Sequence, residues 1–184
     1  SHQGSIYRGS DPTGDLTASL GLYYDQHYQG PGEKIAEVIP GGPADRPDSA
    51  LTPGAVILAV DGAAIEPDMN IDRFLNRKQG QSVLLSVRPA DGGEPVEQKV
   101  KPVSVYAENE LAYERWVAKR REIVERLSNG RIGYIHVRGM ELAPYQDAYG
   151  ELFGRYRDAE AVVVDIRSNG GGNLHDQLDV LLTG

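Results

Sequence analysis

A run of apolar residues that leads into three consecutive glycines constrains the fold of this 184-residue chain more than any other segment. Residues 161–172 read Ala-Val-Val-Val-Asp-Ile-Arg-Ser-Asn-Gly-Gly-Gly, and a helix-like segment follows them. The apolar run predicts a buried strand. Glycines lose much backbone entropy on folding, so three in a row indicate a sharp bend or a close approach to another group. The sequence therefore predicts a strand, a tight turn and a helix that begins near Asn173.

The composition is ordinary for a globular protein, with 40% hydrophobic and 25% charged residues. A net charge of −8 repels phosphate backbones, so no nucleic-acid partner is predicted. The chain has no cysteine, which excludes a disulfide framework, a thiolate nucleophile and a cysteine zinc site. No apolar run approaches the roughly 20 residues of a membrane span. No metal or cofactor is predicted, because His136, His175 and Asp176 have no recognisable ligand spacing.

The order of predicted elements indicates two domains of different class, divided near residue 106. Residues 1–17 read as a lead-in rich in Gly, Ser, Asp and Thr. Residues 18–106 combine short strands with short helices at 44–51 and 70–79, which is typical of a small, partly open β-barrel. Residues 107–184 contain a long helical pattern at 108–128 and then a strand–helix–strand–helix order, which predicts a parallel strand pair. The predicted fold class is therefore α+β for the first domain and truncated βαβα (α/β) for the second.

Residues 18–106 resemble a bacterial PDZ domain. The resemblance rests on Leu20-Gly21-Leu22-Tyr23, on Gly41-Gly42-Pro43-Ala44 and on the segment 51–62, Leu-Thr-Pro-Gly-Ala-Val-Ile-Leu-Ala-Val-Asp-Gly. It implies that a peptide adds as a strand beside residues 20–24, with amides near Gly21 directed at its terminal carboxylate. The groove walls would be Leu22, Ile71, Phe74 and Leu75, although these side chains are equally well explained as core. The bulky segment 23–28 leaves a filled groove as an alternative.

The second half of the chain closely resembles the core of tricorn proteases, which are related to the carboxyl-terminal processing serine proteases. The residues that carry this resemblance are Trp116-Val117, Arg120-Arg121, the segment 128–137, Met140 and the segment 164–172. The resemblance implies a serine peptidase that works through an acyl-enzyme. It also implies that the glycine turn supplies an oxyanion-hole amide, with Gly171 as first choice and Gly170 as second.

The same resemblance implies that Ser1-His2 matches a Ser-His pair, in which His2 is the general base and Ser1 helps to orient it. A Ser-His start is also what a cleaved affinity tag leaves, and that alternative stays open. The family's nucleophilic serine and its acidic partner lie beyond the turn, outside these 184 residues. Ser128 and Ser168 have no histidine in a suitable context. We therefore expect this chain to be inactive by itself.

Three other residues, at the end of the strand and in the turn, are expected to have structural roles. Asp165 and Arg167 are expected to form an ion pair, and Asn169 is expected to orient the turn through a bond from its side chain to the backbone. A phosphate-binding loop also lies between a strand and a helix, but this turn lacks the Gly-Lys-Ser/Thr ending of such loops. A turn required only for packing is the remaining alternative.

Three functions compete, and the first two belong to different classes. One is a serine peptidase whose partners are peptides or unfolded proteins, with a homo-oligomeric full-length form. Another is a non-catalytic PDZ module that binds peptide C-termini, and a third, weaker interpretation is a structural domain with a filled groove. Resemblance to tricorn proteases favours a cytoplasmic location, and resemblance to the processing proteases favours a periplasmic or secreted one.

Overall fold

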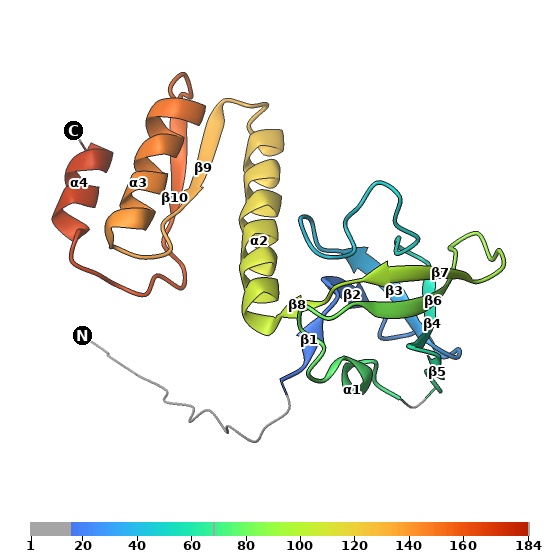
Figure 1. Ribbon diagram of the computed structural model, residues 1–184. Coiled ribbons are helices and arrows are strands. Elements are labelled where there is room, and N and C mark those ends of the chain that lie inside the picture. The colour runs from blue at the N-terminus through green and yellow to red at the C-terminus, as the bar shows by residue number, and fades with distance from the viewer. Residues whose placement is uncertain (1–15, 68, 184) are drawn as a thin grey trace. The chain divides into compact units, whose positions relative to one another are not determined.

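The computed structural model describes residues 16–67 and 69–183, which form two compact units, one up to Ala112 and one from Tyr113 onward (Figure 1). The first unit contains β1 (Ala18–Ser19), β2 (Leu22–Tyr24), β3 (Glu33–Val38), β4 (Val56–Val60), β5 (Ala63–Ala64), α1 (Asp72–Leu75), β6 (Val83–Arg88), β7 (Val96–Val100) and β8 (Val103–Ser104). Helix α2 (Val105–Leu127) begins in this unit and ends in the second. The second unit continues with β9 (Ile132–His136), α3 (Leu142–Gly150), a π-helical turn η1 (Glu151–Arg155), β10 (Ala161–Asp165) and α4 (His175–Thr183).

The first unit is built on an antiparallel sheet with the strand order β2-β3-β4-β6-β7, to which β5 adds beside β4. The Asp61-Gly62 dipeptide connects β4 to β5, and both residues have positive φ, 49° and 82°. Such a pair is the signature of a tight hairpin turn whose twist matches that of the strands. Residues 56–64 therefore form a strand, a tight turn and a short return strand.

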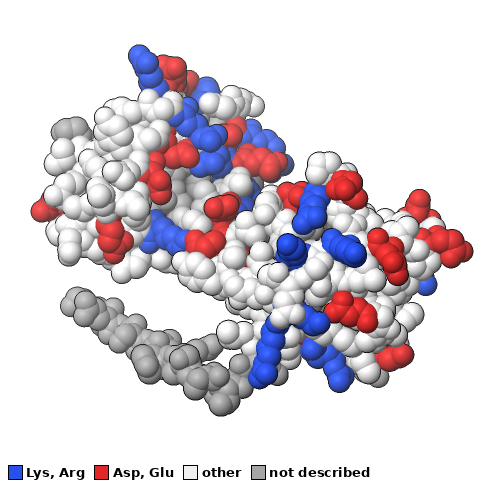
Figure 2. Space-filling model, in the orientation of Figure 1, with Lys and Arg blue, Asp and Glu red and all other residues white. Residues whose placement is uncertain are grey.

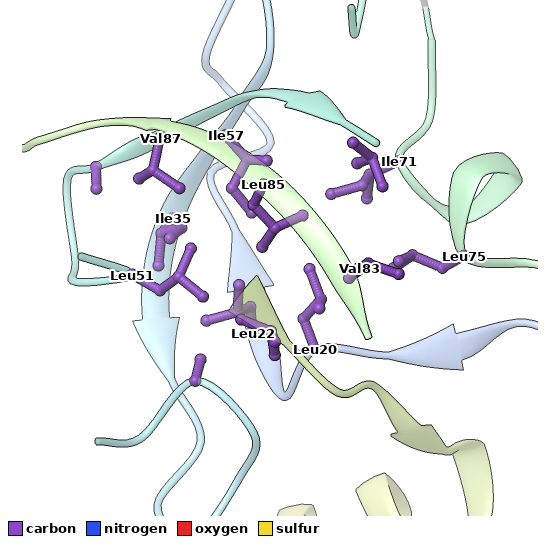
Figure 3. Close-up of a cluster of buried hydrophobic side chains, with 14 of the residues drawn as sticks. Leu20, Leu22, Ile35, Leu51, Ile57, Ile71, Leu75, Val83, Leu85 and Val87 are labelled. Carbon is purple, nitrogen blue, oxygen red and sulfur yellow. The ribbon is translucent and has the colours of Figure 1, made fainter. Parts of the chain in front are cut away.

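One side of this sheet carries the hydrophobic core of the unit. Strand β6 alternates buried and half-buried residues, because successive side chains point to opposite faces. Figure 3 shows the side chains that meet there: Leu20, Leu22, Ile35, Leu51, Ile57, Ile71, Leu75, Val83, Leu85 and Val87. Four of these, Leu20, Leu22, Ile71 and Leu75, belong to the predicted peptide site, and each is at most 5% exposed. Their burial supports the interpretation of these residues as core.

Two predicted helices of the first unit differ from the structure. Residues 44–51 form consecutive turns instead of a helix. Pro47 lacks the amide proton that a helix needs and disfavours helical backbone at Arg46 before it, which explains the difference. The helix expected at 70–79 is reduced to the four residues of α1, because Asn76 is extended with ψ 128° and Arg77 has φ 59°.

The second unit is built on two parallel strands. β10 pairs with β9 in the register Ala161↔Ile132 to Asp165↔His136, which confirms the predicted parallel pairing. Helices α3 and α4 cover one face of this pair through a cluster that includes Ile135, Ala148 and Leu178. The helical segment predicted between the two strands consists of α3 followed by η1, and it contains the glycines Gly150 and Gly154. Because parallel strands end at the same edge, the segments after β9 and β10 lie side by side, as the bridge between Met140 and Gly172 shows.

On the face that Figure 2 shows, acidic and basic side chains are intermixed, and no continuous basic surface is visible. This agrees with the net charge of −8. No helix of the described residues is both long and apolar enough to cross a membrane.

Candidate active-site turn

The glycine turn lies directly after β10 and has an unusual backbone. Ser168, Gly171 and Gly172 have φ angles of 59°, 86° and 140°. Side chains are disfavoured in this region of φ, and glycine adopts it readily. At Gly172 a Cβ atom would also collide with the backbone of Met140. At Gly170 and Gly171 a Cβ would meet nothing within 4 Å, so this part of the turn is open.

Asn169 fixes the turn to the segment that follows β9. Its side-chain amide donates to the carbonyl oxygen of Val137 at 2.8 Å, and its Oδ1 accepts from the amide of Gly171 at 2.7 Å. The amide of Gly170 donates to the carbonyl of Arg138 at 3.0 Å. These contacts confirm that Asn169 orients the turn through its side chain.

The hydrogen bonds also show which turn amides are occupied. The amides of Gly170 and Gly171, the two predicted oxyanion donors, are both occupied, by Arg138 after β9 and by Asn169 in the turn. The carbonyl of Gly171 accepts from the amide of Met140 at 2.7 Å. Among residues 16–67 and 69–183, the amide of Gly172 has no hydrogen-bond acceptor. Gly172 is exposed, so this donor is available to water or to a ligand.

Asp165, at the end of β10, holds the start of the turn. Arg167 donates from Nε to both carboxylate oxygens of Asp165, at 2.9 and 3.0 Å, and a further guanidinium contact completes the pair. The hydroxyl of Tyr134 donates to Asp165 Oδ2 at 2.7 Å. Asp165 and Tyr134 are buried, whereas the Arg167 side chain is 65% exposed. The predicted ion pair is therefore confirmed, with a buried tyrosine as an additional partner.

These contacts determine the protonation of both groups. Hydrogen bonds from Arg167 hold the pKa of Asp165 well below its ordinary value, despite the opposing effect of burial. Burial, with a contribution from the Asp165 carboxylate, raises the pKa of Tyr134 to about 12. At neutral pH the carboxylate is therefore charged and the phenol is protonated, which is what their hydrogen bond requires.

The depressed pKa of Asp165 predicts a loss of stability in acid. A carboxylate whose pKa is lower in the folded state stabilises that state above its unfolded pKa, near 3.9, and loses this contribution as the pH falls further. Trp116, the single tryptophan of the chain, lies in the second unit and reports its unfolding. We expect the urea midpoint followed by its fluorescence to fall between pH 5 and 2.5 in the wild type. The fall should be shallower in Asp165→Asn, and equal slopes would contradict this role.

An aromatic cluster that the sequence did not reveal lies beside the turn. The rings of Tyr113, Trp116 and His136 are in contact, with centroids 4.9 to 6.5 Å apart. His136 Nε2 lies 2.8 Å from the carbonyl of Arg167, which accepts only, so this nitrogen carries the proton. In the tautomer with its proton on Nε2, Nδ1 accepts from the Tyr113 hydroxyl at 2.8 Å. With both ring nitrogens engaged, His136 is not placed to act as a general base here.

Arginine side chains surround this cluster. The guanidinium of Arg120 lies 3.9 Å from the ring centroid of Trp116, and that of Arg138 lies 4.3 Å from the centroid of Tyr113. Such contacts hold the cation on the aromatic face. The only sequence signal for this cluster was the single tryptophan followed by Arg120-Arg121, which the resemblance had used as a family feature.

The predicted peptide site lies in the first unit and is only partly open. Leu20, Leu22 and Leu75 line a small cavity of about 150 Å³ beside β2, whereas Ile71 is enclosed in the core. Phe74 is half-buried against the core, and Tyr23 is 38% exposed. The amide of Gly21 donates to Ser19 Oγ at 2.9 Å.

Two predicted residues, Ser1 and His2, lie outside the described residues. In the part of the chain that is described, no group of three or more His, Asp or Glu side chains is arranged to hold a metal ion.

Comparison with known proteins shows that the chain is similar to peptidases. Residues 131–183 match the model of Peptidase family S41. Tricorn protease homolog 1 of Streptomyces coelicolor is 34% identical over 182 residues, which are 94% of this chain and 17% of that protein. The tricorn protease homolog of Saccharolobus solfataricus is 35% identical over 133 residues, or 71% of this chain and 11% of that protein.

The fold is also similar to that of a solved tricorn protease. The crystal structure of the tricorn protease matches 90% of this chain and 16% of its own, with a TM-score of 0.71 and 24% identity. The chain is thus a mixed α+β protein that contains a segment of peptidase family S41. It is a homologue of tricorn proteases, as its sequence predicted. Since it spans only 17% and 11% of the two relatives, the activity of the whole protein is treated below as a proposal.

Proposed function

We propose that this chain is part of a serine-type peptidase that hydrolyses peptide bonds through an acyl-enzyme. Residues 18–106 are a PDZ-type module that holds peptide, and residues 107–184 are the first part of the catalytic core. The main observation in support is that Asn169 fixes the turn at the end of β10 by hydrogen bonds. This turn lies within the segment that matches Peptidase family S41.

The turn is suited to stabilise an oxyanion. A tetrahedral intermediate places a negative charge on the former carbonyl oxygen, and fixed N–H donors at about 3 Å stabilise it. The amide of Gly172 is available as it stands. The amide of Gly171, the first choice from sequence, becomes available when Asn169 Oδ1 releases it, and the Gly170 amide requires release from Arg138. The amino-terminal end of α4, which follows the turn, adds a favourable dipole.

Other parts of the mechanism come from outside the described residues. His2 as general base and Ser1 as its orienting partner remain proposals from the resemblance. The resemblance to tricorn proteases assigns the nucleophilic serine to a segment beyond the 184 residues, and Ser128 within them has structural partners. Ser128 accepts from the amide of Ile132 at 3.0 Å and donates to the carbonyl of Glu125.

The first test compares the complete gene product with this 184-residue chain on a panel of fluorogenic peptides. We expect cleavage by the long form and none by the short form. In the long form, Gly171→Pro removes an amide proton, and proline cannot adopt the φ of 86° found at this position. The change should therefore lower kcat by about a hundredfold or more, through loss of both the donor and the turn geometry. Gly154→Ala is the matched control, because Gly154 lies outside the turn and a Cβ there meets nothing within 4 Å.

The alternative function is a non-catalytic PDZ module that binds peptide C-termini. An inert long form that binds free C-termini would establish this alternative and overturn the peptidase proposal. The partners of the peptidase would be peptides or unfolded proteins, and the open apolar surface formed by Ile123, Val124 and Val163 is suited to assembly of the full-length protein.

A further inference from the structure

A groove in the first unit has features that a general peptide-binding role does not explain. Two cavities, of about 150 and 420 Å³, lie beside β2, and Tyr24 and Asp72 line both of them. The groove therefore runs between β2 and the start of α1. β2 is the outermost strand of its sheet, which is the position where an extended peptide adds as a further strand.

The side chains that line this groove carry negative charge. Asp25, Glu33 and Asp72 line the larger cavity, and Glu108 joins Asp72 in the smaller one. None of the described residues that line either cavity is a lysine or an arginine. Lys34 lies 3.7 Å from Asp25 and offsets that charge. The carboxylates of Glu33, Asp72 and Glu108 remain, and they can attract a positively charged group in the groove.

The acidic side chains also contribute to the pKa shifts of two groove residues, Tyr24 and Glu33. Burial raises the pKa of Tyr24 well above its ordinary value, and the charges of Glu33, Asp72 and Glu108 raise it further. Burial also raises the pKa of Glu33, with Asp72 adding to the shift and a backbone hydrogen bond from Ile71 opposing it. The interior of the groove is therefore a site of negative potential, and a cation placed there relieves it.

The end of the groove is unsuited to a peptide's C-terminal carboxylate. The Gly21 amide, which the PDZ resemblance assigns to that carboxylate, is bonded to Ser19 Oγ, and both residues are buried. Val105 and Glu108, from the first turn of α2, line the cavity at this end. A terminal carboxylate would therefore meet a like charge and lack its amide donor.

We propose that the groove between β2 and α1 binds an internal, extended peptide segment and selects one with a lysine or arginine side chain, which enters the cavity between Glu33 and Asp72. The apolar stem of this side chain packs against Met69 and Pro67, which line the same cavity. Tyr28 also lines it and already has the ammonium of Lys34 5.9 Å from its ring centroid. The inference rests on the proposed role of residues 18–106 as a peptide-binding module.

The test measures fluorescence anisotropy of labelled nine-residue Thr/Val peptides on the 184-residue chain. Three peptides are acetylated and amidated and differ only in a central Lys, Gln or Glu, and a fourth has a central Gln and a free C-terminus. We expect the Lys peptide to bind about tenfold more tightly than the Gln peptide and the Glu peptide to bind weakest, because several partly exposed charge pairs contribute. Raising the salt concentration should weaken binding of the Lys peptide alone.

Variants assign the selectivity to the groove. Asp72→Asn and Glu33→Gln should each weaken binding of the Lys peptide about threefold and leave the Gln peptide unchanged. Asp72→Lys should reverse the preference toward the Glu peptide. Glu97→Gln is the matched control, because it removes one negative charge from an exposed position on β7 in the same unit, away from the cavities. Circular dichroism checks that each variant is folded.

The outcomes separate this inference from the function on which it rests. Equal affinity for Lys, Gln and Glu peptides would overturn the charge selectivity and leave peptide binding in place. Tighter binding of the free C-terminus would overturn the inference in favour of C-terminal capture. Failure of every peptide to bind would overturn both the inference and the peptide-binding role, whereas the peptidase proposal depends separately on the activity of the long form.

Discussion

Replacement of Asp165 by alanine is expected to lower the free energy of unfolding of the second unit by about 3 kcal/mol. The change removes the acceptor of the Tyr134 hydroxyl, which is buried, and leaves that donor without a partner. It also removes both bonds from Arg167 Nε and the bond from the Arg167 amide. Urea unfolding followed by Trp116 fluorescence measures the effect, because the single tryptophan lies in this unit.

Glu160→Ala is the control for this experiment. Glu160 pairs with Arg131 at 3.3 Å in the same unit, but both side chains are 64% exposed. An exposed pair contributes roughly 0 to 1 kcal/mol, so this variant should unfold near the wild type. A similar loss in the two variants would show that burial of Asp165 and Tyr134 does not govern the stability of the unit.

Replacement of Gly172 by alanine is expected to destabilise the second unit by about 2 to 4 kcal/mol and to break the turn. Its φ of 140° disfavours any side chain, and the added Cβ would overlap the backbone of Met140. The bridge between the two segments must then open, which frees the amides of Met140 and Leu174 that cross it. Hydrogen–deuterium exchange at residues 138–141 and 170–174 should accelerate along with the lowered urea midpoint.

The matched control is Gly150→Ala at the end of α3, where a Cβ meets nothing within 4 Å. Alanine favours helix by up to about 1 kcal/mol over glycine, so this variant should equal or exceed the wild type in stability. If Gly172→Ala were as stable as Gly150→Ala, the turn would have room to relax and the close approach to Met140 would not be a constraint.

Most strands were predictable because their signals are local. Alternation in β6 and the Asp61-Gly62 turn depend on residues that are neighbours in the sequence. The parallel pairing of β9 and β10 was predictable from the helical segment between them, since parallel strands need a crossover. The helix expected at 44–51 failed because Pro47 outweighed the propensity of its neighbours, and α1 was shorter than expected because Asn76 and Arg77 leave helical backbone.

The candidate site shows the same division between local and distant information. The bond between Asn169 and the turn joins residues two apart and was predicted. Which turn amide is open depends in part on the carbonyl of Arg138, which belongs to another segment, and this was not predicted. The acidic groove was also missed, because its carboxylates are distributed between residues 25 and 108 and meet only after folding.

The pairing of β1 with β8 has a consequence for how the first unit is connected to the rest of a protein. Ala18 lies opposite Ser104, and Ser19 lies opposite Val103, so the chain enters and leaves the unit at one place. A unit whose ends are adjacent interrupts a host chain without forcing its two flanks apart, which is the condition under which insertion and circular permutation are tolerated. This closure allows such a unit to be gained, lost or exchanged between proteins, while the surrounding polypeptide keeps its own course.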